Sequence, residues 1–188
     1  MENIIIRPVT ADDAPALLAI YDWYVRHSAV TFEYDVPTKA EFRSRIKHTL
    51  EKYPYLAAEK DGVILGYSYA GAFHPRAAYG WAAELSIYLD RGSRGQGLGR
   101  RLYEEMEKAL TEMGILNLYA CIASTEVEDE YLDNASERFH VRLGYVTVGR
   151  FRKCGYKFGR WYDMIWMEKI IGGHECPPRD VIPYPDLK

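Results

Sequence analysis

The chain has 188 residues, which corresponds to one domain at about 150 residues per domain, with room for a short tail. Hydrophobic residues make up 48% and charged residues 27%, a composition that excludes the disordered and fibrous classes. With 24 Lys and Arg against 27 Asp and Glu, the net charge is −3, which does not favour non-specific nucleic-acid binding. No apolar run approaches the ~20 residues of a membrane span, and the first residues lack signal-peptide features. We therefore expect a soluble, cytoplasmic protein with no nucleic-acid or membrane partner.

The cysteines are odd in number and far apart: Cys121, Cys154 and Cys176. No Cys-x-x-Cys pair occurs, so the sequence predicts neither a disulfide framework nor a zinc site, and we expect no metal. Cys121 lies in an apolar stretch, where a small buried residue is the simplest expectation.

The sequence of the first half of the chain predicts a strand, then two helices and then three strands. Hydrophobic periodicity predicts a strand at residues 4–6, helices at 10–27 and 38–51, and strands at 55–59, 63–70 and 81–89. Both helices start with Thr followed three residues later by an acidic residue, as in a capping box. Asp61-Gly62 fits the two-residue turn of a hairpin.

The second half alternates helices and strands. A helix with one apolar face precedes Gly114, and then come a strand at 117–123, an acidic segment at 124–133, a short helix at 135–143 and strands at 145–151 and 161–169. A hairpin-rich half followed by a βαβ unit predicts an α/β fold with a mixed sheet in α+β-like layers. We expect the domain to span residues 1–171, followed by a proline-rich, irregular tail at 172–188.

The most informative segment is a glycine-rich turn between a strand and an amphipathic helix, Arg94-Gly95-Gln96-Gly97-Leu98-Gly99-Arg100-Arg101. Helix N-termini present unpaired N–H groups to phosphate, glycines let the backbone approach a ligand, and arginines add charged donors. The expected ligand therefore carries a diphosphate or polyphosphate. The spacing matches neither a Walker loop nor the dinucleotide fingerprint. The alternative is a tight turn capped by arginines, without a ligand.

Residues 94–99 resemble the Arg/Gln-x-x-Gly-x-Gly/Ala signature of the GNAT family of N-acetyltransferases, which cradles the pyrophosphate of acetyl-CoA. Residues 52–59, 68–71, 84–89, 139–145 and 155–161 resemble the phosphinothricin and methionine sulfoximine acetyltransferase branch of that family. The resemblance covers roughly residues 4–170. It implies a GNAT fold, in which helices flank a central, mixed, mostly antiparallel twisted sheet. It also implies acetyl-CoA as co-substrate and a homodimer.

The resemblance also implies which residues hold the CoA arm. These are Ile87, Tyr88, Leu89, Arg94, Gly95, Gln96, Gly97, Leu98, Gly99, Arg100 and Asn134. Backbone N–H groups of residues 87–89 would polarise the thioester carbonyl where their strand splays from its neighbour. Asn134 stands near the position of a branch Asn that contacts the CoA arm, but the acidic segment before it is longer than in the branch.

Acetyl transfer to an amine requires removal of the ammonium proton, and the leaving thiolate must be tolerated or protonated. Strand alternation puts Glu84, Ser86 and Tyr88 on one face, and burial would raise the pKa of Glu84 and suit it to general-base catalysis. Glu84 also falls on the base proposed for the branch. His140 stands where many GNAT enzymes have a Tyr that acts as acid to the CoA sulfur, and His can donate or accept the proton. The alternatives are a Glu84 that faces solvent or pairs with Arg, and a His140 packed in the core.

Substrate recognition is expected from segments next to the catalytic strand. Arg76, on the loop before that strand, could pair with a substrate carboxylate through two hydrogen bonds, or could simply be a solvated loop residue. Phe32 and Glu33 lie where the family closes over its substrate. The predicted substrate-binding residues are Phe32, Glu33, Arg76, Tyr79, Leu85 and Ser86.

These observations predict an acetyl-CoA-dependent N-acetyltransferase that acts on the primary amine of a small amino-acid-like compound, with phosphinothricin and methionine sulfoximine analogues first. One alternative is a different amine, such as a polyamine, an aminoglycoside or a protein N-terminus; the acidic segment 124–133 favours a cationic acceptor. The other is a catalytically silent acyl-CoA-binding module, against which the presence of both Glu84 and His140 argues.

Overall fold

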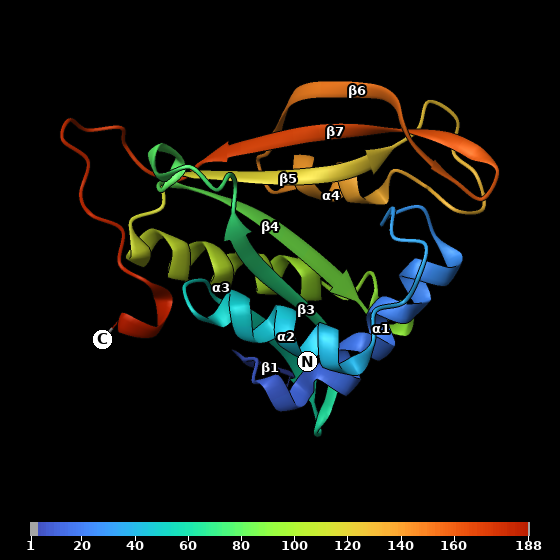
Figure 1. Ribbon diagram of the computed structural model, residues 1–188, viewed down its shortest axis with the longest axis horizontal. Coiled ribbons are helices and arrows are strands. Elements are labelled where there is room, and N and C mark those ends of the chain that lie inside the picture. The colour runs from blue at the N-terminus through green and yellow to red at the C-terminus, as the bar shows by residue number, and fades with distance from the viewer. Residues whose placement is uncertain (1–3, 188) are drawn as a thin grey trace.

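A computed structural model describes residues 4–187, which form a seven-stranded sheet with helices on both faces (Figure 1). The strands are β1 (Ile4–Pro8), β2 (Tyr55–Lys60), β3 (Val63–Ala72), β4 (Ala82–Leu89), β5 (Asn117–Ser124), β6 (Val146–Lys157) and β7 (Arg160–Ile170). The helices are α1 (Ala14–His27), α2 (Lys39–Leu50), α3 (Leu98–Met113) and α4 (Ala135–Arg142). The element order and the fold class predicted from the sequence are confirmed.

The sheet runs in the order β1-β2-β3-β4-β5-β7-β6. Strands β1 to β4 form an antiparallel meander, α3 crosses over to make β5 parallel to β4, and β7 pairs antiparallel with both β5 and β6. The predicted hairpin turn at Asp61-Gly62 has positive φ at both residues, and so does the turn at Phe158-Gly159 between β6 and β7. Two positive φ angles are what a type I′ hairpin turn requires.

The two faces of the sheet carry different helices (Figure 1). Helix α3 and the main core cover one face, against which Leu85, Ile87 and Leu89 of β4 pack. Helices α1 and α2 cover the other face and enclose a second core that includes Tyr67 and contacts Tyr88. The alternation predicted for β4 is therefore confirmed.

Two expectations differ from the structure. Strand β6 does not end at residue 151 but continues to Lys157, through an irregularity in its pairing with β7 between Phe151 and Gly155. Cys121 is exposed rather than buried. Its neighbours Ala120 and Ile122 fill the core beneath β5, so alternation turns the Cys121 side chain to the opposite face.

Residues 172–187 have no α-helix or strand but are attached to the domain. The N–H of Ile182 donates to the carbonyl of Met113 at 2.9 Å, and that of Tyr184 donates to Lys52 at 2.9 Å. Val181 and Tyr184 pack against the main core. The boundary predicted at residue 171 stays a prediction.

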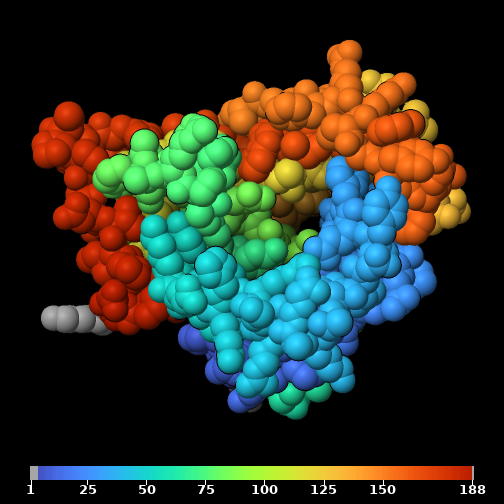
Figure 2. Space-filling model, in the orientation of Figure 1, coloured from blue at the N-terminus to red at the C-terminus, as the bar shows by residue number. Residues whose placement is uncertain are grey.

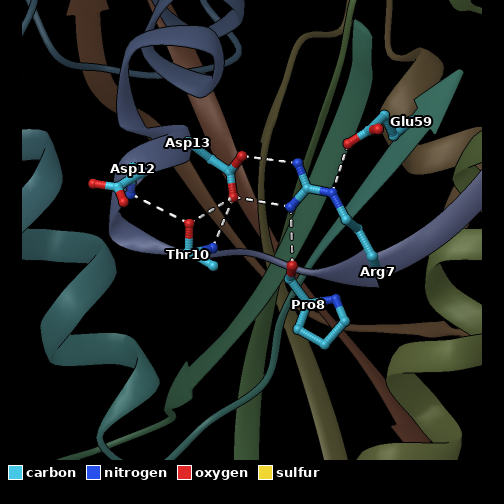
Figure 3. A network of polar contacts seen from close by, with 6 residues as sticks. All are labelled: Arg7, Pro8, Thr10, Asp12, Asp13 and Glu59. Carbon is cyan, nitrogen blue, oxygen red and sulfur yellow. Dashed lines mark hydrogen bonds and ion pairs between the residues drawn. The ribbon is translucent and has the colours of Figure 1, made fainter. Parts of the chain in front are cut away.

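A polar network fixes the 3₁₀ turn at residues 11–13, which leads into α1 (Figure 3). Arg7 donates to both carboxylate oxygens of Asp13, at 2.8 and 2.9 Å, and to Glu59 on β2 at 2.6 Å. The N–H of Thr10 donates to Asp13 at 2.7 Å, which completes a capping box. The hydrogen bond from Arg7 lowers the pKa of Asp13. This network anchors the first end of α1, and residues 28–34 follow its other end.

Candidate active site

The sheet opens between β4 and β5. These strands pair only from Ala82 to Glu84, opposite 117–119; beyond this point β4 continues beside β3, and β5 continues beside β7. Figure 2 shows a hollow on the side of the molecule where α1 and α2 lie, bordered by the blue segment after α1 and the orange segment of β6. A cavity of 50 Å³ lies in the split. It is lined by Val30, Leu85, Ser86, Ile87, Tyr88, Tyr103, Ala120, Cys121, Ile122, Ala123, Ser136 and His140.

The edge of β4 that faces the split offers backbone donors. The hydroxyl of Tyr24 donates to the carbonyl of Leu89 at 2.7 Å and accepts from its N–H at 3.3 Å, so these groups of Leu89 point away from β3. Peptide groups alternate in direction along a strand, so the N–H of Ile87 points to the same edge. Among the described residues, β5 does not pair with β4 at this position. The N–H of Ile87 is therefore placed to polarise a carbonyl in the split.

The glycine-rich turn leads into the N-terminus of α3. Gly95 and Gly97 have φ of 76° and 77°, in the left-handed region, and Gly97 starts the helix without a side-chain cap. The first N–H groups of α3 are therefore left for another acceptor. A Cβ at Gly99 would lie 3.0 Å from the ring of Phe139. A larger side chain at position 99 would thus displace Phe139.

A second cavity of 230 Å³ connects this turn with the split. Arg94, Gly95 and Gly99 line its outer part, while Ile87 and Ser136 line this cavity and the cavity in the split. The guanidinium of Arg94 is held by the hydroxyl of Tyr24 at 2.9 Å. A diphosphate at the turn and a thioester in the split fit this arrangement.

Several predicted cofactor residues have other partners. Arg100 donates to Glu104 at 2.8 Å, and Gln96 donates to the carbonyl of Gly92 at 3.2 Å. The amide of Asn134 exchanges two hydrogen bonds with the backbone of Thr125, at 2.8 and 3.0 Å. Asp133 and Ala135, on either side of Asn134, line the larger cavity instead. A cofactor contact from Arg100, Gln96 or Asn134 stays a prediction.

Glu84 lies at the last paired position of β4, where the split begins. Burial raises the pKa of its carboxyl group. Among the described residues its carboxylate has no hydrogen-bond or ion-pair partner, so the alternative of a Glu84–Arg pair is not found there. Alternation turns Glu84 and Ser86 to the side of α1 and α2. A carboxylate with a raised pKa at this position has the properties of a general base.

His140 reaches the split from the opposite face. It is 2% exposed, with Nδ1 2.7 Å from the carbonyl of Ser136 and Nε2 2.9 Å from the hydroxyl of Tyr103. A carbonyl only accepts, so Nδ1 carries the proton and Tyr103 donates to Nε2. Burial lowers the pKa of His140 to about 4. His140 is thus neutral near pH 7, and its unprotonated nitrogen is engaged by Tyr103.

The segments predicted to bind substrate flank the Glu84 side. Phe73, at the start of the Arg76 loop, stacks on Tyr119 with ring centroids 4.1 Å apart, and Tyr119 is the β5 residue opposite Glu84. Arg76 is exposed and its side chain has no partner among residues 4–187. Tyr79 is also exposed. The predicted residues Leu85 and Ser86 line the cavity in the split.

Residues 28–34 form the opposite wall. The carboxylate of Glu33 accepts from Arg45 of α2 at 2.7 Å. Phe32 packs with a small core formed by Ala29, Ala123, Leu132 and Tyr162.

Most carboxylates of the acidic segment 124–133 form ion pairs with arginines elsewhere in the protein. Asp129 accepts from the Tyr162 hydroxyl at 3.0 Å and pairs with Arg160 at 2.9 Å. Glu130 also pairs with Arg160, and Glu128 pairs with Arg138. Because two arginines balance two of these three negative charges, the segment gives less support to a cationic acceptor than its composition indicated.

Sequence reasoning did not single out several residues that line the two cavities, among them Tyr24, Val30, Tyr103 and Ser136. Tyr24 and Tyr103 occupy apolar helix positions, where a tyrosine reads as core. Their hydroxyl groups were the only available signal, since a buried Tyr usually needs a hydrogen-bond partner.

The family model of the acetyltransferase (GNAT) domain matches residues 6–166. The chain belongs to the GNAT family. A phosphinothricin N-acetyltransferase of Streptomyces viridochromogenes is 33% identical over 95% of this chain and 93% of its own. An L-methionine sulfoximine/L-methionine sulfone acetyltransferase of Salmonella typhimurium is 28% identical over 92% of this chain and 97% of its own.

A solved structure of a GNAT acetyltransferase is similar to this chain over nearly its whole length. The GNAT superfamily phosphinothricin acetyltransferase of Sinorhizobium meliloti, in complex with acetyl-CoA, superposes with a TM-score of 0.84 at 31% identity and covers 97% of this chain and 96% of its own. The protein is therefore an N-acetyltransferase of the GNAT family. None of the helices within residues 4–187 has the length and hydropathy that a membrane crossing requires.

Proposed function

We propose that this N-acetyltransferase acetylates the primary amine of a small amino-acid-like compound, with phosphinothricin and methionine sulfoximine as the first candidates. The observation that carries the proposal is the similarity, over nearly the whole chain, to relatives that bear these substrates in their names. The accessible Arg76 supports it, since a guanidinium can pair with the carboxylate of an amino acid.

The glycine-rich turn is the place for the pyrophosphate of acetyl-CoA, which supplies an activated acetyl group. The uncapped N–H groups at the start of α3 and the guanidinium of Arg94 are suitable donors. The N–H of Ile87 then has the direction to polarise the thioester carbonyl. Val30 lines both cavities and helps to exclude water from the split.

Glu84 acts as the general base, directly or through a water. An acceptor ammonium gives its proton to Glu84, and the free amine forms a C–N bond with the acetyl carbon while the C–S bond breaks. The nitrogen loses its second proton as the amide forms, and the thiolate takes up this proton, directly or through water, so that CoA leaves as the thiol. Burial of Glu84 supports this role, because a raised pKa brings a carboxylate nearer to the pH at which it works.

His140 is better suited to hold Tyr103 than to donate a proton. Its lowered pKa leaves almost no imidazolium at neutral pH, and Tyr103 occupies Nε2. In this role His140 orients the side chain of Tyr103, a residue that lines the cavity in the split. The sequence-based prediction is that His140 protonates the thiolate or shares the base role. It is tested by measuring kcat for a His140 variant beside kcat for a Glu84 variant.

A cytoplasmic homodimer completes the proposal. Strand β6 is an edge of the sheet and exposes Val146, Val148 and Phe151. A long edge strand with exposed apolar side chains favours association with a second copy. The three free cysteines suit a reducing compartment.

The test is thiol release from acetyl-CoA with phosphinothricin, methionine sulfoximine, methionine sulfone, spermidine and an aminoglycoside. We expect the amino-acid analogues to give the highest kcat/KM. A preference for spermidine or the aminoglycoside would favour the alternative of a cationic acceptor. Binding of acetyl-CoA without turnover of any amine would favour a silent acyl-CoA-binding module.

A further inference from the structure

The end of β6 contacts residues 28–34 at three consecutive positions. A Cβ at Gly155 would lie 2.3 Å from a ring carbon of Phe32, so the ring lies directly on the glycine backbone. The next residue, Tyr156, accepts a hydrogen bond at its carbonyl from the hydroxyl of Tyr34. After it, Lys157 donates from Nζ to the carbonyl oxygens of Ser28 and Thr31, at 2.9 and 2.7 Å.

Lys157 is an unusual residue for this position, because it is 2% exposed. Lysine is almost never fully buried unless its ammonium group is paired. Here its partners are two backbone carbonyls, and burial lowers the pKa of Lys157 to about 8. These carbonyls belong to a loop that has no regular secondary structure of its own. The buried amine therefore compensates polar groups that the loop cannot satisfy by itself.

The two carbonyls flank Val30, which lines both the cavity in the split and the cavity that leads to the glycine-rich turn. The Gly155 contact fixes Phe32, and Glu33 follows directly. The segment that β6 holds thus carries one wall of the transfer cavity and two predicted acceptor-binding residues.

We propose that residues 155–157 of β6 form a clamp that holds residues 28–34 against the split, and that Gly155 and Lys157 are positioning residues for the acceptor side of the active site. The kinetic consequence rests on the proposed function, whereas the structural consequence does not. Neither residue lines a cavity of the site, so both act through the loop.

The first test is Gly155→Ala, with Gly149→Ala on the same strand as the control. The backbone of Gly155 is outside the left-handed region, so it tolerates Ala, and the atoms nearest to the new Cβ all belong to the Phe32 ring, which is displaced. At Gly149 a Cβ would have no atom within 4 Å. We expect amide hydrogen exchange of residues 29–34 to accelerate at least tenfold in Gly155→Ala and to stay unchanged in Gly149→Ala. Lys157→Met, which keeps the length of the side chain but removes its donors, should have the same effect as Gly155→Ala.

The second test separates positioning from general loosening. Both clamp variants should raise KM for the acceptor amine about tenfold. The Kd of acetyl-CoA and kcat should change less than twofold, because Val30 is the one residue of the segment that the lining of the cofactor cavity includes. Adding Phe32→Val to Gly155→Ala should restore slow exchange, because valine lacks all three ring atoms, Cδ2, Cε2 and Cζ, that meet the new Cβ. Unchanged exchange in both variants, or a parallel loss of acetyl-CoA affinity, would overturn the clamp. A wild-type protein that acetylates no amine would refute the proposed function instead, and the exchange measurement would still decide on the clamp.

Discussion

The two sides of the split are built in different ways. The glycine-rich turn on the cofactor side is one short segment, residues 94–99, in which Gly95 and Gly97 have left-handed φ angles and whose last residues start α3. The acceptor side combines β4 with two loops, at 28–34 and 73–80, that are far apart in the sequence and are held by β6 and by aromatic stacking on β5. A site made from one backbone conformation leaves a motif in the sequence, whereas a site made from tertiary contacts does not.

The largest expected effect concerns Glu84, where the two sides meet. Glu84→Gln should lower kcat by 10²–10⁴-fold, the usual contribution of a general base. The acetyl-CoA Kd should not change, because residue 84 lies outside the cavity at the turn. The pH profile of kcat/KM provides the check. In the wild type, activity should rise with pH as Glu84, whose pKa is raised, loses its proton. The variant should lack this rise and recover part of its activity at high pH, where solvent supplies free amine. Near-native kcat at all pH values would remove Glu84 as the base.

The same contrast explains which features of the fold can be predicted from the sequence. Capping boxes, turn dipeptides and the amphipathic face of α3 are local signals, and the elements they predict are all present. Strand β6 was predicted too short because its irregular pairing after Phe151 hides the alternation. The exposure of Cys121 depends on which face of β5 meets α3, and that is a tertiary property.

For the site, Glu84 and the glycine-rich turn could be found from type and position. The pairing of His140 with Tyr103 could not, because the two residues belong to different helices and their contact depends on how α3 and α4 pack. The same holds for Lys157, whose partners lie more than a hundred residues away and are backbone atoms that any sequence would offer.

The second prediction concerns the stability of the folded protein at low pH, which depends on His140, buried in the split. The pKa of His140 is about 4 in the folded protein, against about 6.5 for an ordinary histidine, because burial lowers it. Between these pH values the unfolded chain therefore binds more protons than the folded protein does. The free energy of unfolding should have its full value above about pH 6.5 and should decrease as the pH falls toward 4. At 1.36 kcal/mol per pKa unit the loss is about 3 kcal/mol.

Urea unfolding of the wild type and of His140→Gln at several pH values measures this loss. The free energy of the variant should depend less steeply on pH between 4 and 6.5. His48→Gln, at an exposed histidine, is the matched control and should follow the wild type. A slope that is equal in all three proteins would show that the burial of His140 has no effect on its protonation.

The third prediction tests whether the cofactor side depends only on its short segment. Acetyl-CoA at 100 times its Kd should stabilise the wild type by roughly 2.7 kcal/mol. Gly97→Val should abolish this gain because φ of 77° strains a branched residue. Gly99→Val should abolish it because the new side chain would meet Phe139. Gly173→Val, with open space around its Cβ, should keep the full shift. A full shift in both turn variants would mean that the pyrophosphate binds elsewhere.

The smallest expected effect tests the acceptor side alone. Arg76 has no partner among the described residues and lies on a loop outside both cavities, so its contribution must come from the substrate. A charge-assisted hydrogen bond contributes about 1.5–3 kcal/mol, and exposure to solvent places Arg76 at the low end, which corresponds to an increase of about tenfold in the KM for the amine in Arg76→Ala. Arg76→Lys should recover only part of this loss, because an ammonium group cannot form the paired hydrogen bonds of a guanidinium. An acceptor amine without a carboxylate should have the same KM with the wild type and with Arg76→Ala. If that amine is affected as strongly as the amino acid, then Arg76 shapes its loop rather than binding the carboxylate, and recognition on the acceptor side must come from residues 28–34.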